Sequence, residues 1–268
     1  MEKNFDIQER QVPSDGYSSR ATVVGTVLSA PCALVPVPFL DDILLAKVRK
    51  GMVHRVLREN GVLTDPRRMK VVYAGISKGC FLTVIGLAGS LVVKIFKKLF
   101  RTIFFIFAVR GAALEMTETY LLGRVVIRCA ERGWYSDPDT CREQALHTRA
   151  AFNKAMNGTD GRVFVKAMKA VWRGAASSKS VVKRLAKHLV RGSKSSPEVG
   201  EEDLTSEDRR VVEEGEKSVN RQLRQKEVQE FLAKFDERFD RYLENELEES
   251  SKDEKSTSQI FQSENSVS

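Results

Sequence analysis

Apolar positions recur at helical spacing along most of the chain, and alternating strand patterns are almost absent. The pattern predicts an all-α protein, with a helical body over residues 21–191 and a charged amphipathic helix over 203–249. A polar leader, 1–20, precedes the body, and a polar, serine-rich linker, 192–202, joins the body to the last helix. Residues 250–268 have too few apolar side chains to form a buried face, so we expect them to be disordered.

Proline, glycine and capping residues divide the body into shorter helices. An apolar helix over 21–30 is expected to end at a proline-rich turn, because proline lacks a backbone donor and restricts the residue before it. The helices that follow are expected at 43–59, capped by Asp41 or Asp42 and ended by Asn60-Gly61; at 79–110; at 112–132, after Gly111; from Asp137-Pro138, or from a capping box at Thr140, to Asn157-Gly158; at 162–173; and at 180–191.

Three of these helices carry a basic stripe on one face and apolar side chains on the other. The cations are Lys94, Lys97, Lys98 and Arg101 in the first, Arg162, Lys166, Lys169 and Arg173 in the second, and Lys183, Arg184, Lys187 and Arg191 in the third. The expected apolar contacts of the first helix are Phe96, Phe100, Ile103, Phe104 and Phe107. One such stripe is equally typical of a solvated helix face, but three together favour an anionic partner.

The charge distribution supports the same interpretation. The net charge of the chain is +8, but residues 1–200 carry 33 Lys and Arg against 16 Asp and Glu, a net charge of +17. Residues 201–255 carry 11 against 19, a net charge of −8. A basic body followed by an acidic tail indicates either a membrane surface or a nucleic acid as the partner.

A membrane surface is the favoured partner. Aromatic and aliphatic side chains opposite Lys and Arg are typical of a helix in a bilayer interface, where anionic lipid attracts the cations. The uncharged runs 21–40 and 79–93 are too broken or too short to span a bilayer simply, so peripheral or re-entrant attachment is expected. The polar leader shows no signal peptide, which favours the cytoplasmic face of the inner membrane and a role as scaffold or adaptor. The alternative is a nucleic-acid-binding protein with an acidic regulatory tail, because phosphate contacts need only cations.

The sequence contains no pattern typical of an enzyme or of a metal or cofactor site. Phosphate-binding loops, dinucleotide fingerprints, zinc-protease helices and nucleophile elbows are all absent from it. The carboxylate pair Asp41-Asp42 has a simpler explanation as a helix cap. The histidines are scattered, and the cysteines form no close pair: they are Cys32, Cys80, Cys129 and Cys141. We therefore expect no catalytic residue, no metal, no disulfide and no cofactor.

One segment resembles a known family. The run Leu34-Val35-Pro36-Val37-Pro38-Phe39-Leu40-Asp41-Asp42 is similar to the Pro-x-Pro-x-x-Asp segment of the EcsC-like and YcjF-like membrane-associated proteins of bacteria. Residues 79–110 resemble the glycine-rich apolar helical pair that follows that segment, and 117–124 the next helix. The resemblance covers about residues 21–135 and implies an all-helical, non-enzymatic protein associated with the inner membrane. Some relatives carry a GTPase module, which a chain without a phosphate loop does not share.

The last predicted helix has an apolar stripe that needs a surface to cover it, because an isolated helix of this length is marginal in water. The stripe consists of Val228, Phe231, Leu232, Phe235, Phe239, Tyr242, Leu243 and Leu247, and the opposite side of Glu230, Lys234, Asp236, Glu237, Arg241 and Glu244. Phe231, Phe235 and Phe239 are expected to contact a membrane or a partner, such as a second copy in a coiled coil, unless the helix folds back on the body. The width of the stripe and the acidic charge favour folding back, which would mask the cations of the body.

Overall fold

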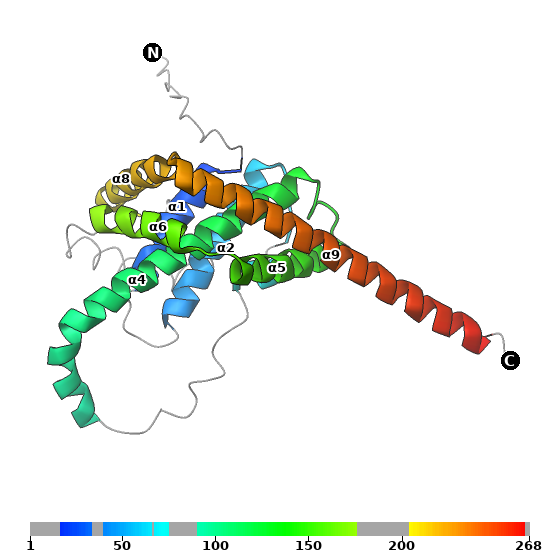
Figure 1. Cartoon of the computed structure of the whole chain (residues 1–268), viewed down its shortest axis with the longest axis horizontal. Helices are drawn as coiled ribbons and strands as arrows, with labels where there is room; N and C mark the ends of the chain where they lie inside the picture. Colours follow the sequence, from blue (N-terminus) through cyan, green and yellow to red (C-terminus); the bar gives the residue numbers. More distant parts are fainter. Residues whose placement is uncertain (1–16, 34–39, 66, 75–89, 176–203, 266–268) are drawn as a thin grey trace, which may run out of the picture.

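The computed structural model describes residues 17–33, 40–65, 67–74, 90–175 and 204–265, with the backbone alone for 40–41, 90–108, 175 and 249–265. This part of the chain is all-α, as predicted, and contains eight helices and no strand (Figure 1). The helices are α1 (Arg20–Cys32), α2 (Leu40–Glu59), α3 (Lys70–Ala74), α4 (Ser90–Glu131), α5 (Cys141–Gly158), α6 (Arg162–Ala175), α8 (Ser206–Leu223) and α9 (Lys226–Asn265). The helix predicted at 180–191, the linker at 192–202 and residues 79–89 lie outside the described residues.

Helix α1 forms the centre of the fold. Every residue from Ala21 to Cys32 is buried, and the helix packs against α2, α4 and α8. Its hydroxyl groups are satisfied within the helix: Thr26 donates to the carbonyl of Thr22 at 2.8 Å, and Ser29 to the carbonyl of Thr26 at 2.7 Å. The prediction that this uncharged run contacts a membrane is therefore wrong for residues 21–32, which are covered by protein.

Small side chains let the neighbouring helices approach α1 closely. A Cβ atom added at Gly123 of α4 would lie 2.6 Å from the Cγ2 atom of Thr22. A Cβ atom at Gly215 of α8 would lie 2.8 Å from Cγ1 of Val27, and 2.9 Å from Cγ2. Both glycines therefore occupy contact points at which any larger residue would push the helices apart.

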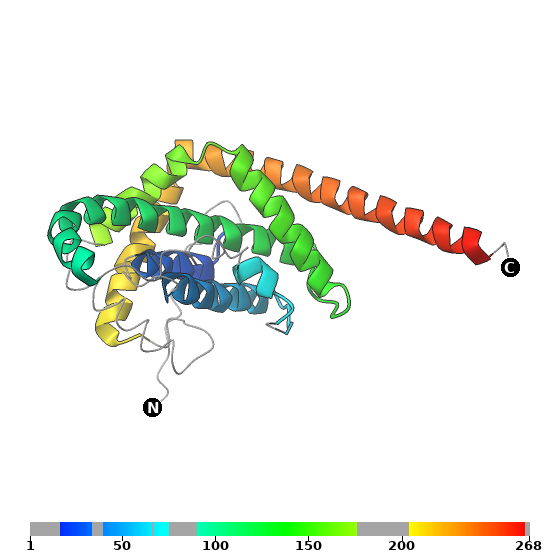
Figure 2. The same cartoon turned by 90° about the horizontal axis from the view of Figure 1, so that it is seen from below.

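Helix α4 is continuous from Ser90 to Glu131, so the break predicted at Gly111 is wrong. A single glycine costs a helix only about 1 kcal/mol, and packing of α4 against α1 offsets this cost. A Cβ atom at Gly111 would lie 3.8 Å from the Cβ atom of Ala33, the residue that follows α1. Figure 2 shows α2 along one side of α4 and α6 along the other. The long helix thus separates two faces of the molecule.

Several predicted helix ends are confirmed and others are wrong. α2 ends at Glu59, and Gly61 follows in the left-handed region at φ 74°, as the Asn60-Gly61 signal predicted. Its start at Leu40 places Asp41 and Asp42 in the first turn and not at the cap. Carboxylates in the first turn of a helix suit the positive end of its dipole. α1 runs two residues further than expected and includes Pro31 in its last turn, although proline supplies no backbone donor there.

Helix α5 begins at Cys141, not at the predicted Asp137-Pro138. The Asp137 carboxylate instead closes a turn before the helix, accepting from the Asp139 backbone at 3.0 Å and from the Thr140 hydroxyl at 3.1 Å. Thr140 occupies the cap position of the alternative prediction, but its side chain makes no capping hydrogen bond. The predicted end at Asn157-Gly158 is confirmed.

The acidic C-terminal part folds back on the body, which was the favoured alternative. It forms two helices, α8 and α9, where one was predicted, with a break at Arg224 and Gln225. Phe231, Phe235 and Phe239 are buried in the same core as α1 and α4, so the expectation that they contact a membrane or an external partner is wrong. Removing residues 203–268 would therefore remove core side chains as well as any mask over the cations.

Beyond this core α9 continues to Asn265 and extends past the other helices (Figures 1 and 2). Residues 250–268 were expected to be disordered, but the backbone is helical up to Asn265. The segment contains neither proline nor glycine, so no residue in it breaks the helix.

Ion pairs hold α9 against α4. Arg124 donates to both carboxylate oxygens of Asp236, with its shortest contact at 2.6 Å. Arg128 pairs with Asp236 at 3.4 Å and also with Asp240. The ring of Tyr17 covers the two guanidinium groups, 4.3 Å from that of Arg128 and 5.3 Å from that of Arg124. Asp236, expected on the solvated side of the helix, is therefore a buried partner of two arginines.

We predict that Gly215→Ala destabilises the fold by about 1–3 kcal/mol, because overpacking at Val27 outweighs the better helix propensity of alanine. Gly174→Ala in α6 is the control, because its added Cβ would have no heavy atom within 4 Å. Urea unfolding followed by circular dichroism measures both variants. Equal stability of the two would contradict the close contact between α8 and α1.

Candidate functional site

The structure places the second basic stripe on the outer face of α6. Arg162, Lys166 and Arg173 are exposed and Lys169 is partly buried. The apolar side of the helix lies in the core, with Phe164 and Met168 fully buried. The membrane-insertion role predicted for this helix is therefore wrong in its apolar part, and only its cations are available to an external anion.

A groove of about 530 Å³ lies between α6 and the break that separates α8 from α9. Its lining consists of Arg162, Val163, Lys166, Ala167, Ala170, Gln222, Gln225, Glu227 and Val228. Asp160 neutralises one of the cations, since Arg162 pairs with its carboxylate at 2.6 Å and thereby lowers the pKa of Asp160. With Glu227 on the α9 side, the groove carries charges of both signs and is not a strongly anion-binding site.

The first basic stripe belongs to the beginning of α4. Figure 1 shows this part of the helix extending away from the other helices. The side chains of Lys94, Lys97, Lys98 and Arg101, and of the expected apolar contacts Phe96, Phe100, Ile103, Phe104 and Phe107, are outside the described residues. The third stripe, Lys183, Arg184, Lys187 and Arg191, is outside them entirely.

Two exposed apolar residues lie near the point where α4 leaves the body. Leu114 of α4 is 46% exposed and Ile43 of α2 is 51% exposed. Met52 of α2 and Gly123 of α4 contact neighbouring turns of α1. Earlier in both helices, Arg49 of α2 pairs with Glu115 of α4 at 2.9 Å. The two helices therefore run parallel. The start of α2 is therefore level with the residues that precede Leu114 in α4, and the apolar character of 90–108 continues onto the body.

A fourth group of cations was not predicted from the sequence. It occupies α2, the turn after it and α3, and consists of Lys47, Lys50, Arg55, Arg58, Arg67, Arg68 and Lys70. Acidic residues of the same segment are Asp42, Glu59 and Asp65 among the side chains described. These cations do not form a stripe in a helical projection of one helix, which explains why they were missed. Folding places α2 on the opposite side of α4 from α6 (Figure 2).

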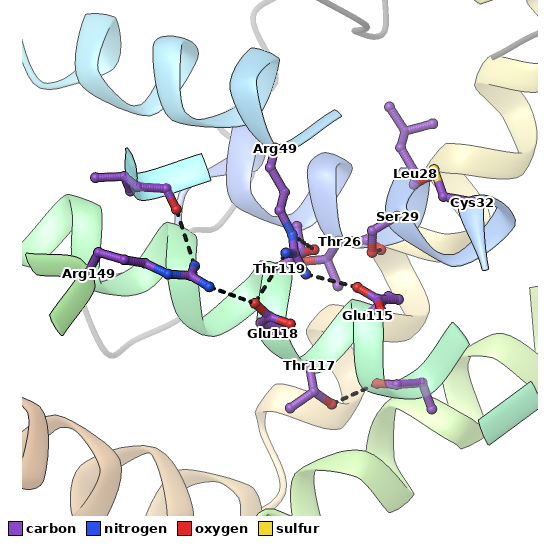
Figure 3. A network of polar contacts seen from close by, with 12 residues as sticks. Thr26, Leu28, Ser29, Cys32, Arg49, Glu115, Thr117, Glu118, Thr119 and Arg149 are labelled. Atoms are coloured by element: carbon purple, nitrogen blue, oxygen red, sulfur yellow. Dashed lines mark hydrogen bonds and ion pairs between the residues drawn. The ribbon is translucent and has the colours of Figure 1, made fainter. Parts of the chain in front are cut away.

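A buried polar network joins α2, α4 and α5 (Figure 3). Arg49 donates to Glu118 at 3.2 Å, to Glu115 at 2.9 Å and to the Thr119 hydroxyl at 3.1 Å. Arg149 donates to Glu118 at 3.4 Å and to the carbonyl of Val72 at 3.2 Å. Burial alone would raise the pKa of Glu118, but the two guanidinium groups outweigh that effect and lower it. The acid is therefore ionised at neutral pH and serves as a structural counterion, unsuited to general acid catalysis.

A second buried polar group surrounds Tyr135. The Tyr135 hydroxyl lies 2.5 Å from the Thr148 hydroxyl. Burial raises the pKa of Tyr135 well above its ordinary value. Burial likewise raises the pKa of the Cys129 thiol, whose sulfur lies 3.6 Å from the Thr148 hydroxyl. A thiol with a raised pKa is a poor nucleophile. The contacts of Cys129 and Tyr135 with Thr148 instead join α4 and the following connection to α5.

Within the part of the chain that the structure describes, no three His, Cys, Asp or Glu side chains form a group that could hold a metal ion. None of the described helices combines the length and the apolar composition needed to cross a bilayer. No family model matches the chain, and no similar curated protein or solved structure was found. The resemblance to EcsC-like and YcjF-like proteins therefore stays a prediction.

We predict that Glu118→Gln lowers the free energy of unfolding at pH 7 by about 2 kcal/mol, because two buried arginines lose a counterion. The folded pKa of Glu118 lies below its ordinary value of 4.5, so its stabilisation is complete above that value and is lost as the pH falls through the folded pKa. The difference between wild type and variant should therefore shrink in acid.

Urea unfolding between pH 3.5 and 7 measures this difference. Glu230→Gln is the control, because its contact with Lys226 is long, at 3.9 Å, and both side chains are exposed. A Glu118→Gln variant as stable as the control at pH 7 would contradict the role of the network.

Proposed function

We propose that the protein is a non-enzymatic helical scaffold or adaptor that associates with the anionic cytoplasmic face of a membrane. The observation that carries this proposal is the beginning of α4, which leaves the compact body as a helix (Figure 1). Its sequence combines four cations with large apolar residues, the composition of a helix that lies in a bilayer interface. An isolated helix of this kind is marginal in water and gains stability by covering its apolar side.

The body supports the same proposal. Ile43 and Leu114 add exposed apolar surface near the base of the extending helix. Arg58 at the end of α2, and Arg67 and Lys70 after it, are exposed cations that lipid phosphates can bind. Attachment in this arrangement is peripheral: the interface helix and the cations of the body act together, as stable anchoring needs more than one weak signal.

Nucleic acid is the second candidate, and the exposed face of α6 favours it. All charged residues of α6 are cations, and three of them are exposed. Phosphate contacts require no more than this, whereas sequence recognition would need base-reading side chains. The two candidates therefore use opposite sides of α4.

We predict that the purified full-length chain sediments with vesicles of phosphatidylcholine and phosphatidylglycerol, and much less with phosphatidylcholine alone. Raising the NaCl concentration from 50 to 500 mM should weaken this binding, because salt screens the cations. Replacing Lys94, Lys97, Lys98 and Arg101 by Gln should reduce the affinity about 100-fold or more, since each cation near an anionic surface contributes about 1 kcal/mol.

Circular dichroism of the four-residue variant shows whether the fold is intact. Binding to a DNA duplex under the same conditions, with a steep salt dependence, is the result expected for the second candidate. A chain that binds duplex DNA and neither vesicle would overturn the membrane proposal.

A further inference from the structure

The most exposed large apolar side chain described is Leu63, in the turn between α2 and α3. It is 85% exposed, whereas the preceding Val62 is 6% exposed and belongs to the core. A leucine in this position contributes nothing to the packing of the fold. Single exposed apolar side chains are normal on a protein surface. This one indicates a contact because hydrogen bonds hold its turn and cations flank it in the sequence.

Hydrogen bonds fix the turn on both sides of Leu63. The Val62 backbone donates to the Leu57 carbonyl at 2.8 Å, and Gly61 donates to the Arg58 carbonyl at 3.1 Å. The hydroxyl of Thr64 lies 3.2 Å from the sulfur of Cys141, which ties the turn to α5. The backbone thus holds the leucine outward, and the side chain cannot reach the core by a small rearrangement.

Cations precede and follow this leucine in the sequence, at the end of α2, in the turn and at the start of α3. Arg58, Arg67 and Lys70 are exposed, and Arg68 is partly buried. The carboxylates nearby in sequence are Glu59 and Asp65, and Asp65 already accepts a hydrogen bond from the Arg67 backbone at 2.8 Å. We call Arg58, Leu63, Arg67 and Lys70 the turn surface. It combines one projecting aliphatic side chain with three exposed cations.

This combination fits a lipid surface better than a protein partner. A protein interface needs a contiguous apolar area, and a single leucine does not supply one. At a bilayer, one aliphatic side chain can enter the boundary between headgroups and acyl chains while cations remain at the level of the phosphates. The turn surface begins at the end of α2, which Figure 2 shows on the side of α4 opposite α6, and the exposed Ile43 belongs to the same helix.

We propose that the turn surface is a second membrane contact, in which Leu63 enters the interface of an anionic bilayer while Arg58, Arg67 and Lys70 bind lipid phosphates. This inference rests on the proposed membrane association and adds its orientation: α2 faces the bilayer, and α6 faces away from it. The beginning of α4 and the turn surface then attach the body at two ends of one face.

The test uses the full-length chain and vesicles of phosphatidylcholine and phosphatidylglycerol. Leu63→Ser should reduce the affinity about tenfold, as expected for losing the burial of one leucine side chain. Replacing Arg58, Arg67 and Lys70 by Gln should reduce it about 100-fold, since each cation near an anionic surface contributes about a fivefold factor. All four side chains are exposed, so these variants should fold normally.

Two matched controls lie away from the α2 face. Leu247→Ser replaces an exposed leucine of α9, and the triple replacement of Arg162, Lys166 and Arg173 by Gln removes the same charge from α6. Both should bind anionic vesicles nearly as well as the wild type. A further readout is a tryptophan at position 63: the emission of Leu63→Trp should shift to the blue with vesicles, while that of Leu247→Trp should not.

The outcomes separate the two proposals. A wild-type chain that binds anionic vesicles, with the turn variants no weaker than the α6 and α9 controls, overturns the turn surface and leaves membrane association standing. A wild-type chain that binds no vesicles overturns both. Selective loss of binding in the turn variants, with the blue shift at position 63, supports the orientation with α2 on the bilayer.

Discussion

Complete burial of α1 is the constraint on which the rest of the structure depends. A helix without a polar face must be covered on all sides, so α2, α4 and α8 surround it. Close approach requires small residues at the contacts, which explains Gly123 and Gly215. The acidic C-terminal segment is consequently part of the core: α8 closes one side of α1, and α9 then covers α5 and α6.

The sequence predicted the all-α class and most helix positions, because apolar spacing and glycine signals act locally. It could not predict which apolar surfaces are covered by the chain itself. The uncharged run 21–32 and the stripe with Phe231, Phe235 and Phe239 have the same composition whether they meet lipid or protein. The break at Arg224 and Gln225 contains neither proline nor glycine, so no local signal existed. At this break the packing partners change: α8 packs on α6 and α1, whereas α9 packs mainly on α5 and also on α6.

For the ion pairs a usable signal existed. Arg124 and Arg128 of α4 and Arg132, just after its end, are spaced by four residues, and Asp236 and Asp240 of α9 have the same spacing. Matching rows of opposite charge predict two helices lying side by side in register. The cations of α2, the turn and α3 gave no comparable signal, because they are divided among three segments and form no stripe on a single helix.

The order in which the core is completed has a consequence for biosynthesis. Buried side chains of α9 reach as far as Leu243, more than 200 residues after the start of α1. Roughly 200 residues lie between α1 and the last helices that cover it. At about 5–20 residues per second, their synthesis takes about 10–40 s. During that interval the nascent chain carries uncovered apolar helices. The native core therefore cannot close before α8 and the buried part of α9 have been synthesised.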